Sequence, residues 1–140
     1  ISACLVGSEM CIRDSRSGKC FVSPSRLIVI DVDHLDSYEE AVGMRRTLFD
    51  DPFLRPVLVY ISPSGRGVKA FIPAGMPHPT DEVRNITEST DKAMQYVEMA
   101  YGPETDNSAT ATAKGVDGSG KDLVRACFLS HDPEALFRTI

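Results

Sequence analysis

The order of the apolar segments is the feature that most constrains the fold of this chain. Short runs rich in Val and Ile indicate strands, whereas apolar residues that repeat every three or four positions indicate helices. We expect a strand, a helix, two strands, a helix and a strand, at about residues 26–33, 38–50, 57–62, 68–74, 81–101 and 123–130. This βαββαβ order predicts an α+β fold of the ferredoxin-like or RRM-like type, in which two helices cover one face of a sheet.

The first helix has a clear start. Ser37 and Glu40 have the spacing of a capping box, in which the Ser side chain accepts a hydrogen bond from the backbone N–H three residues later. The apolar stripe of this helix is expected to consist of Ala41, Met44 and Leu48. Residues 102–122 are rich in Gly, Ser, Thr and Asp, so we expect a loop there, with a short strand at about 113–117.

Composition limits the class of protein. A chain of 140 residues with 42% hydrophobic residues is long enough for one globular domain, and it contains no apolar run long enough to cross a membrane. The formal net charge of −5 argues against a protein that grips nucleic acid by overall charge. A local basic cleft stays open, because the distribution of charge decides such binding more than its sum.

The N-terminal stretch is unlike the rest of the chain. Residues 5–15, "LVGSEMCIRDS", match the translation of a transposase-based sequencing adapter. We therefore interpret residues 1–15 as an adapter-derived artefact and exclude them from the fold, which leaves 16–140 as part of a domain from a larger protein. Cys20 and Cys127, which remain, are too few for a disulfide framework.

Two carboxylates end the first strand, in "IVIDVDHLDS". Asp31 and Asp33 alternate along the strand, so their side chains point to the same side. Like charges this close repel unless a positive group lies between them, and paired hard oxygens suit Mg²⁺ or Mn²⁺. The alternative is that one carboxylate caps the following helix and the other is solvated.

A glycine-rich turn joins the second and third strands, in "SPSGRGVKAF". Gly65 and Gly67 let the backbone bend and approach a ligand, and the amides of such a bend can form an anion nest. Ser64 adds a hydroxyl, and Lys69 follows on the next strand, from where an ammonium can reach a phosphate. The alternative is a plain hairpin turn with basic residues at the surface.

A third candidate motif lies near the C-terminus, in "KGVDGSGKDLVRACFLSHDP". Asp117 follows an apolar residue and precedes a flexible sequence, so it can approach the same metal, although "DGSG" is also a good turn sequence. Arg125 lies inside an apolar strand, where a cation is usually paired or functional.

Together, the three motifs resemble the archaeo-eukaryotic primase-polymerase superfamily. The nearest likeness is to its mobile-element branch with a VirE N-terminal domain, in which forms of "DVDHL", "SPSGRGVK" and "DGSGKDLVRACF" recur in this order. The resemblance spans about residues 26–135 and implies a palm-like primase-polymerase core. The chain departs from the wider superfamily at Lys69, where many relatives have His.

The resemblance implies nucleotidyl transfer with two divalent ions. Asp31, Asp33 and Asp117 would be the catalytic residues and would hold two Mg²⁺ or Mn²⁺ ions. The residues that would contact the triphosphate are Ser64, Gly65, Arg66, Gly67, Lys69 and Arg125. The implied partners are nucleoside triphosphates, a single-stranded or primed DNA template and a replicative helicase domain. The implied setting is mobile-element, plasmid or phage replication in the bacterial cytoplasm, with no membrane.

Two other functions stay open. A haloacid-dehalogenase-like phosphatase would use Asp31 as nucleophile and Asp33 as acid and base, but its second motif needs a helix where this chain predicts a hairpin. A non-catalytic nucleic-acid-binding module of the same fold would need exposed aromatic residues paired with basic ones, and the sequence shows no such pairing.

The histidines carry less information than the acids. We expect His34 and His78 to lie at the surface or behind the ligands rather than to bind a metal. His131 and Asp132 match the wording "FLSHDP" of the resembling family, and the sequence assigns them no role.

Overall fold

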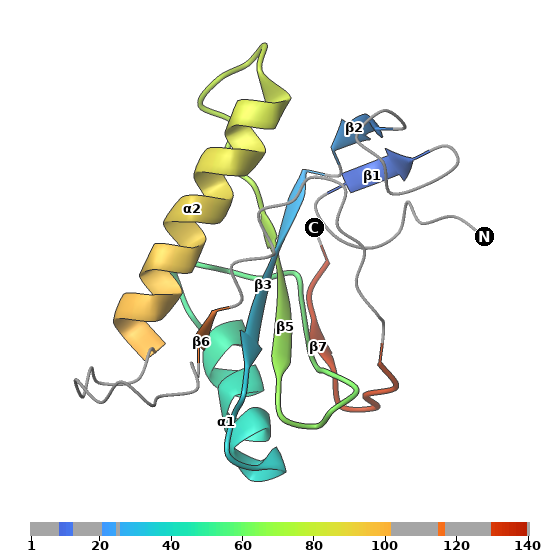
Figure 1. Ribbon diagram of the computed structural model, residues 1–140, viewed down its shortest axis with the longest axis vertical. Helices are drawn as coiled ribbons and strands as arrows, with labels where there is room; N and C mark the ends of the chain where they lie inside the picture. The colour runs from blue at the N-terminus through green and yellow to red at the C-terminus, as the bar shows by residue number, and fades with distance from the viewer. Residues whose placement is uncertain (1–8, 13–20, 25, 102–114, 117–129, 140) are drawn as a thin grey trace.

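The computed structural model describes residues 9–12, 21–24, 26–101, 115–116 and 130–139 (Figure 1). The described elements, in chain order, are β1 (Glu9–Ile12), β2 (Phe21–Pro24), β3 (Leu27–Asp33), α1 (Tyr38–Phe49), β4 (Leu58–Ile61), β5 (Val68–Pro73), α2 (Glu82–Tyr101), β6 (Gly115–Val116) and β7 (Leu136–Phe137). Neither described helix is long and apolar enough to span a bilayer.

The main sheet has the order β6-β3-β5-β4-β7, and every neighbouring pair is antiparallel. From β3 to β6 the elements follow the predicted βαββαβ order. The central pair, β3 and β5, runs in register from Leu27 opposite Pro73 to Val32 opposite Val68. The predicted α+β fold is therefore confirmed.

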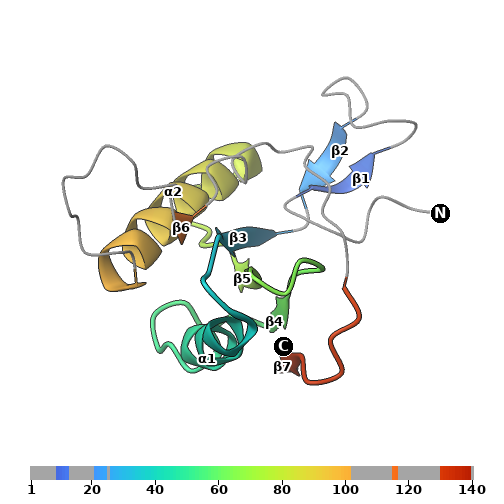
Figure 2. The ribbon, with the colours of Figure 1, turned by 60° about the horizontal axis from the view of Figure 1, so that its bottom comes forward.

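Both helices pack on the same face of this sheet (Figure 2). One continuous core joins alternate residues of the three central strands to α1 and α2, and includes Ile30, Val59, Ala70, Leu48 and Val97. The intervening strand residues point to the other face. There they form a smaller apolar cluster of Val29, Tyr60 and Phe71.

Helix α1 begins as predicted. The Ser37 side chain accepts a hydrogen bond from the Glu40 amide at 3.2 Å, and the Glu40 carboxylate accepts one from the Asp36 amide at 2.7 Å. All three residues of the expected stripe pack on the core, and Arg45, which was not expected there, is also buried between Ala41 and Leu48. Met44 is half-buried at the border of the core.

The sheet edges differ most from the expectation. The short strand expected at 113–117 is present as β6, which pairs with β3 as the fourth strand of the βαββαβ unit. Residues 123–129 of the expected last strand lie outside the described residues. Strand β7 pairs with β4 at the opposite edge and was not predicted, since it is only two residues long. The hairpin of β1 and β2 was also missed, because residues 1–15 had been excluded.

A buried carboxylate joins the start of the α1–β4 connection to α2. One oxygen of Asp51 accepts hydrogen bonds from the amides of Phe53 and Leu54, each at 2.8 Å. The other oxygen accepts the hydroxyl of Tyr96 at 2.8 Å and the hydroxyl of Tyr101. Burial alone would raise the pKa of Asp51, but these hydrogen bonds outweigh it and lower the pKa below its usual value.

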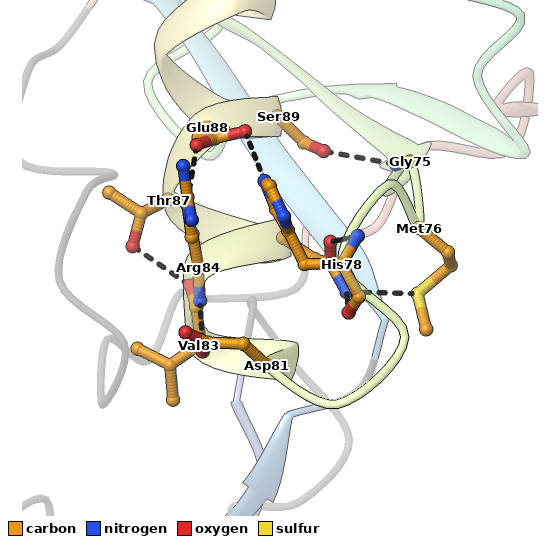
Figure 3. Close-up of polar contacts among 10 residues, drawn as sticks. Gly75, Met76, His78, Asp81, Val83, Arg84, Thr87, Glu88 and Ser89 are labelled. Carbon is orange, nitrogen blue, oxygen red and sulfur yellow. Dashed lines mark hydrogen bonds and ion pairs between the residues drawn. The ribbon is translucent and has the colours of Figure 1, made fainter.

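A second polar network joins the β5–α2 connection to the first turns of α2 (Figure 3). The fully buried Asn85 side chain accepts a hydrogen bond from the His78 amide at 2.9 Å and donates one to the His78 carbonyl at 2.8 Å. The ring of His78 lies 3.0 Å from the carboxylate of Glu88, which also accepts from Arg84 at 2.8 Å. His78 is thus half-buried in a structural network, apart from the acidic end of β3.

Candidate functional site

The predicted catalytic strand and the predicted nucleotide-binding strand are neighbours in the sheet. Asp31 on β3 stands directly opposite Lys69 on β5, and the Lys69 ammonium forms an ion pair with the Asp31 carboxylate. Both residues are buried, with 3% and 8% of their surface exposed. By strand alternation they lie on the face of the sheet opposite the helices. The positive group beside Asp31 in the described structure is therefore Lys69.

The β4–β5 turn presses against the end of β3 at Gly67. An ideal Cβ placed on Gly67 would lie 2.6 Å from Oδ1 of Asp33 and 2.7 Å from the hydroxyl oxygen of Ser62. Only a glycine fits this approach without displacing one of its neighbours. The amide of Leu35 donates to the carbonyl of Arg66 at 2.9 Å, which fixes the turn beside the strand end.

The turn itself is held by short-range hydrogen bonds. The amide of Ser62 donates to the Gly67 carbonyl at 2.8 Å, and the amide of Gly65 donates to the Ser62 carbonyl at 2.9 Å. Gly65 has a φ of 73°, in the left-handed region that favours glycine. The hydroxyl oxygens of Ser62 and Ser64 lie 3.0 Å apart, and the Ser64 oxygen accepts from the Arg66 amide at 3.2 Å. The side chains of Ser64 and Arg66 lie at the surface.

The segment that follows residue 129 packs beside this turn. Asp132 accepts two hydrogen bonds from one nitrogen of Arg45, both at 2.9 Å, and a third from the Ile61 amide at 3.0 Å. The hydroxyl of Ser130 donates to the Ile61 carbonyl. The side chains of Arg45 and Asp132 are only 6% and 5% exposed. Burial alone would raise the pKa of Asp132, but the bonds from Ile61 and Arg45 lower it below its usual value.

These contacts explain a motif to which the sequence had assigned no role. Asp132 of "FLSHDP" anchors the C-terminal segment to α1 and to the end of β4. Its partner Arg45 was missed, although a signal was present: Arg45 lies four residues after Ala41, on the buried side of the helix.

An open pocket of about 450 Å³ lies between the turn and the C-terminal segment. Its lining consists of Tyr38, Ile61, Ser62, Pro63, Gly65, Ser130, His131, Asp132 and Pro133. Ser62 belongs both to this pocket and to the contact between Gly67 and Asp33. The pocket and the acidic end of β3 are therefore adjacent parts of one region.

The described residues contain two of the three predicted metal ligands. Asp31 and Asp33 lie on one side of β3, and their hard carboxylate oxygens suit Mg²⁺ or Mn²⁺. Among the residues with described positions, no three acidic, His or Cys side chains form a metal-binding group. Asp117 and Arg125 lie outside the described ranges, so their predicted roles stay predictions. His34 is exposed, with a φ of 61° where β3 ends.

One comparison with known proteins gave a match. The family model described as "BT4734-like, N-terminal domain" matches residues 5–137, which is nearly the whole chain. The matched range includes the end of β3, the β4–β5 turn and the segment around Asp132. It also includes residues 5–15, whose origin from an adapter stays a prediction. No match was found among curated proteins or among solved structures.

Proposed function

The chain belongs to the BT4734-like N-terminal domain family, and on that premise we propose that it is a metal-dependent nucleotidyltransferase of the primase-polymerase kind. This family is associated with primase-like proteins. The observation that carries the proposal is the close contact between Gly67 and Asp33. It brings the β4–β5 turn, which carries the exposed side chains of Ser64 and Arg66, to a strand end that carries two carboxylates.

The turn would bind the triphosphate of a nucleotide. Ser64 offers an exposed hydroxyl and Arg66 an exposed guanidinium, both on the same short turn. Lys69 has three N–H donors, so it can hold Asp31 and still donate to a phosphate oxygen. Lysine is a point charge, which suits a triphosphate even where related proteins have His.

The carboxylates would hold the metal ions. Asp31 and Asp33 would bind Mg²⁺ or Mn²⁺ together with Asp117, and the lack of a side chain at Gly67 lets Oδ1 of Asp33 lie against the turn. When bound, such ions neutralise charge on the triphosphate and lower the pKa of an attacking hydroxyl. Lys69 would compensate the charge of Asp31 whenever no ion is there. A single-stranded or primed DNA template would be the second substrate, and a helicase domain the functional partner.

A specific observation favours a second candidate, a non-catalytic nucleic-acid-binding module of the same fold. The ion pair between Lys69 and Asp31 balances the charge of a buried carboxylate without a metal, as expected in a site that no longer uses one. The phosphatase alternative is weaker, because β4 continues through a turn into β5 rather than into a helix.

The experiment measures nucleotide binding by isothermal calorimetry, with and without Mn²⁺, followed by primer extension on a single-stranded template. The variants are Asp31→Asn and Asp33→Asn, and the control is Glu39→Gln, an exposed acid in the first turn of α1. We expect Mn²⁺-dependent binding and extension in the wild type and the control. Both should fall at least tenfold in the two Asp variants.

Circular dichroism checks that each variant is folded. A folded wild type that binds no triphosphate in Mn²⁺ would refute the proposal. Metal-independent binding of single-stranded DNA, unchanged in Asp31→Asn and without extension, would establish the non-catalytic module instead.

A further inference from the structure

We propose that the pocket between the β4–β5 turn and the Ser130–Pro133 segment binds the base and sugar of the nucleoside triphosphate. This inference rests on the proposed function, which assigns the triphosphate to the turn. A volume of about 450 Å³ lies within the range of small-molecule sites, roughly 300–1,000 Å³. The pocket is open to solvent, as a site must be for a substrate that continues into a second subsite.

The position of Ser62 links the two subsites. Its side chain lines the pocket, and its hydroxyl oxygen lies 3.0 Å from that of Ser64 on the exposed side of the turn. The same hydroxyl oxygen would lie 2.7 Å from a Cβ on Gly67, which also approaches Asp33. A ligand that leaves the pocket past Ser62 therefore reaches the turn and the carboxylates of β3, in the order base, sugar, phosphates, metal.

The walls of the pocket suit an uncharged, flat group. Tyr38 is 54% exposed, and its ring packs beside Gly65, where an ideal Cβ would lie 3.6 Å from the ring. Pro63 and Pro133 add apolar surfaces. No lysine or arginine is found among the described residues that line the pocket, so its chemistry does not favour phosphate. An aromatic ring beside apolar walls is a surface on which a base stacks.

Polar groups at the rim suit a sugar or the edge of a base. The Ser130 hydroxyl donates its proton to the Ile61 carbonyl, so its oxygen could only accept a hydrogen bond from a ligand. His131 is exposed and adds a ring nitrogen. Because stacking on Tyr38 needs only a flat π-system, we expect modest discrimination among the four bases.

The pocket is preformed, because the segment that forms one wall, Ser130–Pro133, is held by buried contacts. The buried ion pair of Asp132 with Arg45, and the bond from the Ile61 amide, hold the Ser130–Pro133 segment against α1 and β4. A rigid wall of this kind lowers the entropy lost when a ligand binds.

The test compares two ligands by calorimetry in excess Mn²⁺: ATP and inorganic tripolyphosphate, which lacks a nucleoside. The full chain is measured as wild type, Tyr38→Ala and Tyr38→Phe, with Phe137→Ala as the control for an exposed aromatic residue away from the pocket. We expect Tyr38→Ala to weaken ATP binding by roughly 5- to 150-fold, the range that loss of one base stack produces. Tripolyphosphate binding should not change, and Tyr38→Phe and Phe137→Ala should behave as the wild type.

The outcomes separate this inference from the proposed function. If the wild type binds ATP no more tightly than tripolyphosphate, or if Tyr38→Ala weakens both ligands equally, the nucleoside pocket is refuted while the phosphate site stands. If ATP binding depends on Tyr38 but primer extension is absent, the pocket stands and nucleotidyl transfer is refuted. If a folded wild type binds neither ligand, both proposals are refuted.

Discussion

Two glycines of this chain should respond to the same substitution in opposite ways. Gly67→Ala places a methyl group 2.6 Å from Oδ1 of Asp33, 2.7 Å from the Ser62 hydroxyl and 3.2 Å from the Val32 carbonyl. Gly43→Ala, in the middle of α1, places the same methyl group where nothing lies within 4 Å.

The expected magnitudes follow from these surroundings. Ordinary contacts of a Cβ begin at about 3.4 Å, so Gly67→Ala must displace two side chains by several tenths of an ångström. The side chains of Asp33 and Ser62 can rotate away, but the backbone carbonyl of Val32 cannot. We therefore expect Gly67→Ala to lower the free energy of unfolding by about 1–3 kcal/mol, as for other overpacked sites. Gly43→Ala should raise the free energy of unfolding by about 0.8–1 kcal/mol, because alanine has the higher helix propensity.

The two measurements are urea denaturation of each variant and calorimetric titration with ATP in Mn²⁺. Gly67→Ala should also weaken Mn²⁺-dependent ATP binding at least tenfold, because the displaced groups belong to the proposed site. Gly43→Ala should bind ATP as the wild type does. If Gly67→Ala is as stable as the wild type and binds ATP equally well, Gly67 does not approach Asp33 closely, and the proposed arrangement of the site is refuted.

Three further outcomes concern the buried polar groups. Arg45→Met should lower the free energy of unfolding in urea by about 3–5 kcal/mol, because Asp132 stays buried without its cation. Adding Asp132→Leu should recover only part of this loss, because the Ile61 amide then lacks its acceptor. A double variant that is no more stable than Arg45→Met would contradict this expectation. The pKa of Asp51 is lowered in the folded state, so its contribution to the free energy of unfolding is complete above the usual value of 3.8 and is lost as the pH falls through the folded pKa. Asp51→Asn should therefore flatten the acid limb of a curve of stability against pH. An unchanged acid limb would contradict this. Desolvation and Asp51 raise the pKa of Tyr101, and the hydrogen bond to Asp51 raises the pKa of Tyr96. Both phenols should therefore ionise above pH 10 in an absorbance titration. In Asp51→Asn they should ionise nearer to pH 10.

Much of the fold is legible in the sequence because its signals are local. The β-branched run before Asp33 predicts β3, and the spacing of Ser37 and Glu40 predicts the start of α1; both depend on neighbours along the chain. Strand β7 pairs only two residues with β4, so its signal is a contact across the fold that no local pattern carries. Excluding residues 1–15 removed β1 from consideration altogether.

The site could be predicted as a set of residues but not as a set of partners. The sequence placed Asp31 and Lys69 in different motifs with different ligands, and the strand register sets them face to face. That register depends on which strands are neighbours, and the order of segments along the chain does not fix it by itself. The pair of Arg45 and Asp132 spans 87 residues, so only packing could reveal it.

In the proposed site, the anchored C-terminal segment and the β4–β5 hairpin would recognise different parts of the substrate. The hairpin would hold the phosphates, whereas the segment after residue 129 would supply one side of the nucleoside pocket. Two contacts hold that segment against α1. Asp132 pairs with Arg45, and the guanidinium of Arg138 lies 4.3 Å from the ring centre of Phe49 and donates a hydrogen bond to the backbone carbonyl of Phe49. If the proposed function holds, substitutions at His131 or Pro133 would alter nucleoside binding without disturbing the carboxylates of β3. Nucleoside selectivity and catalysis would then be able to diverge independently.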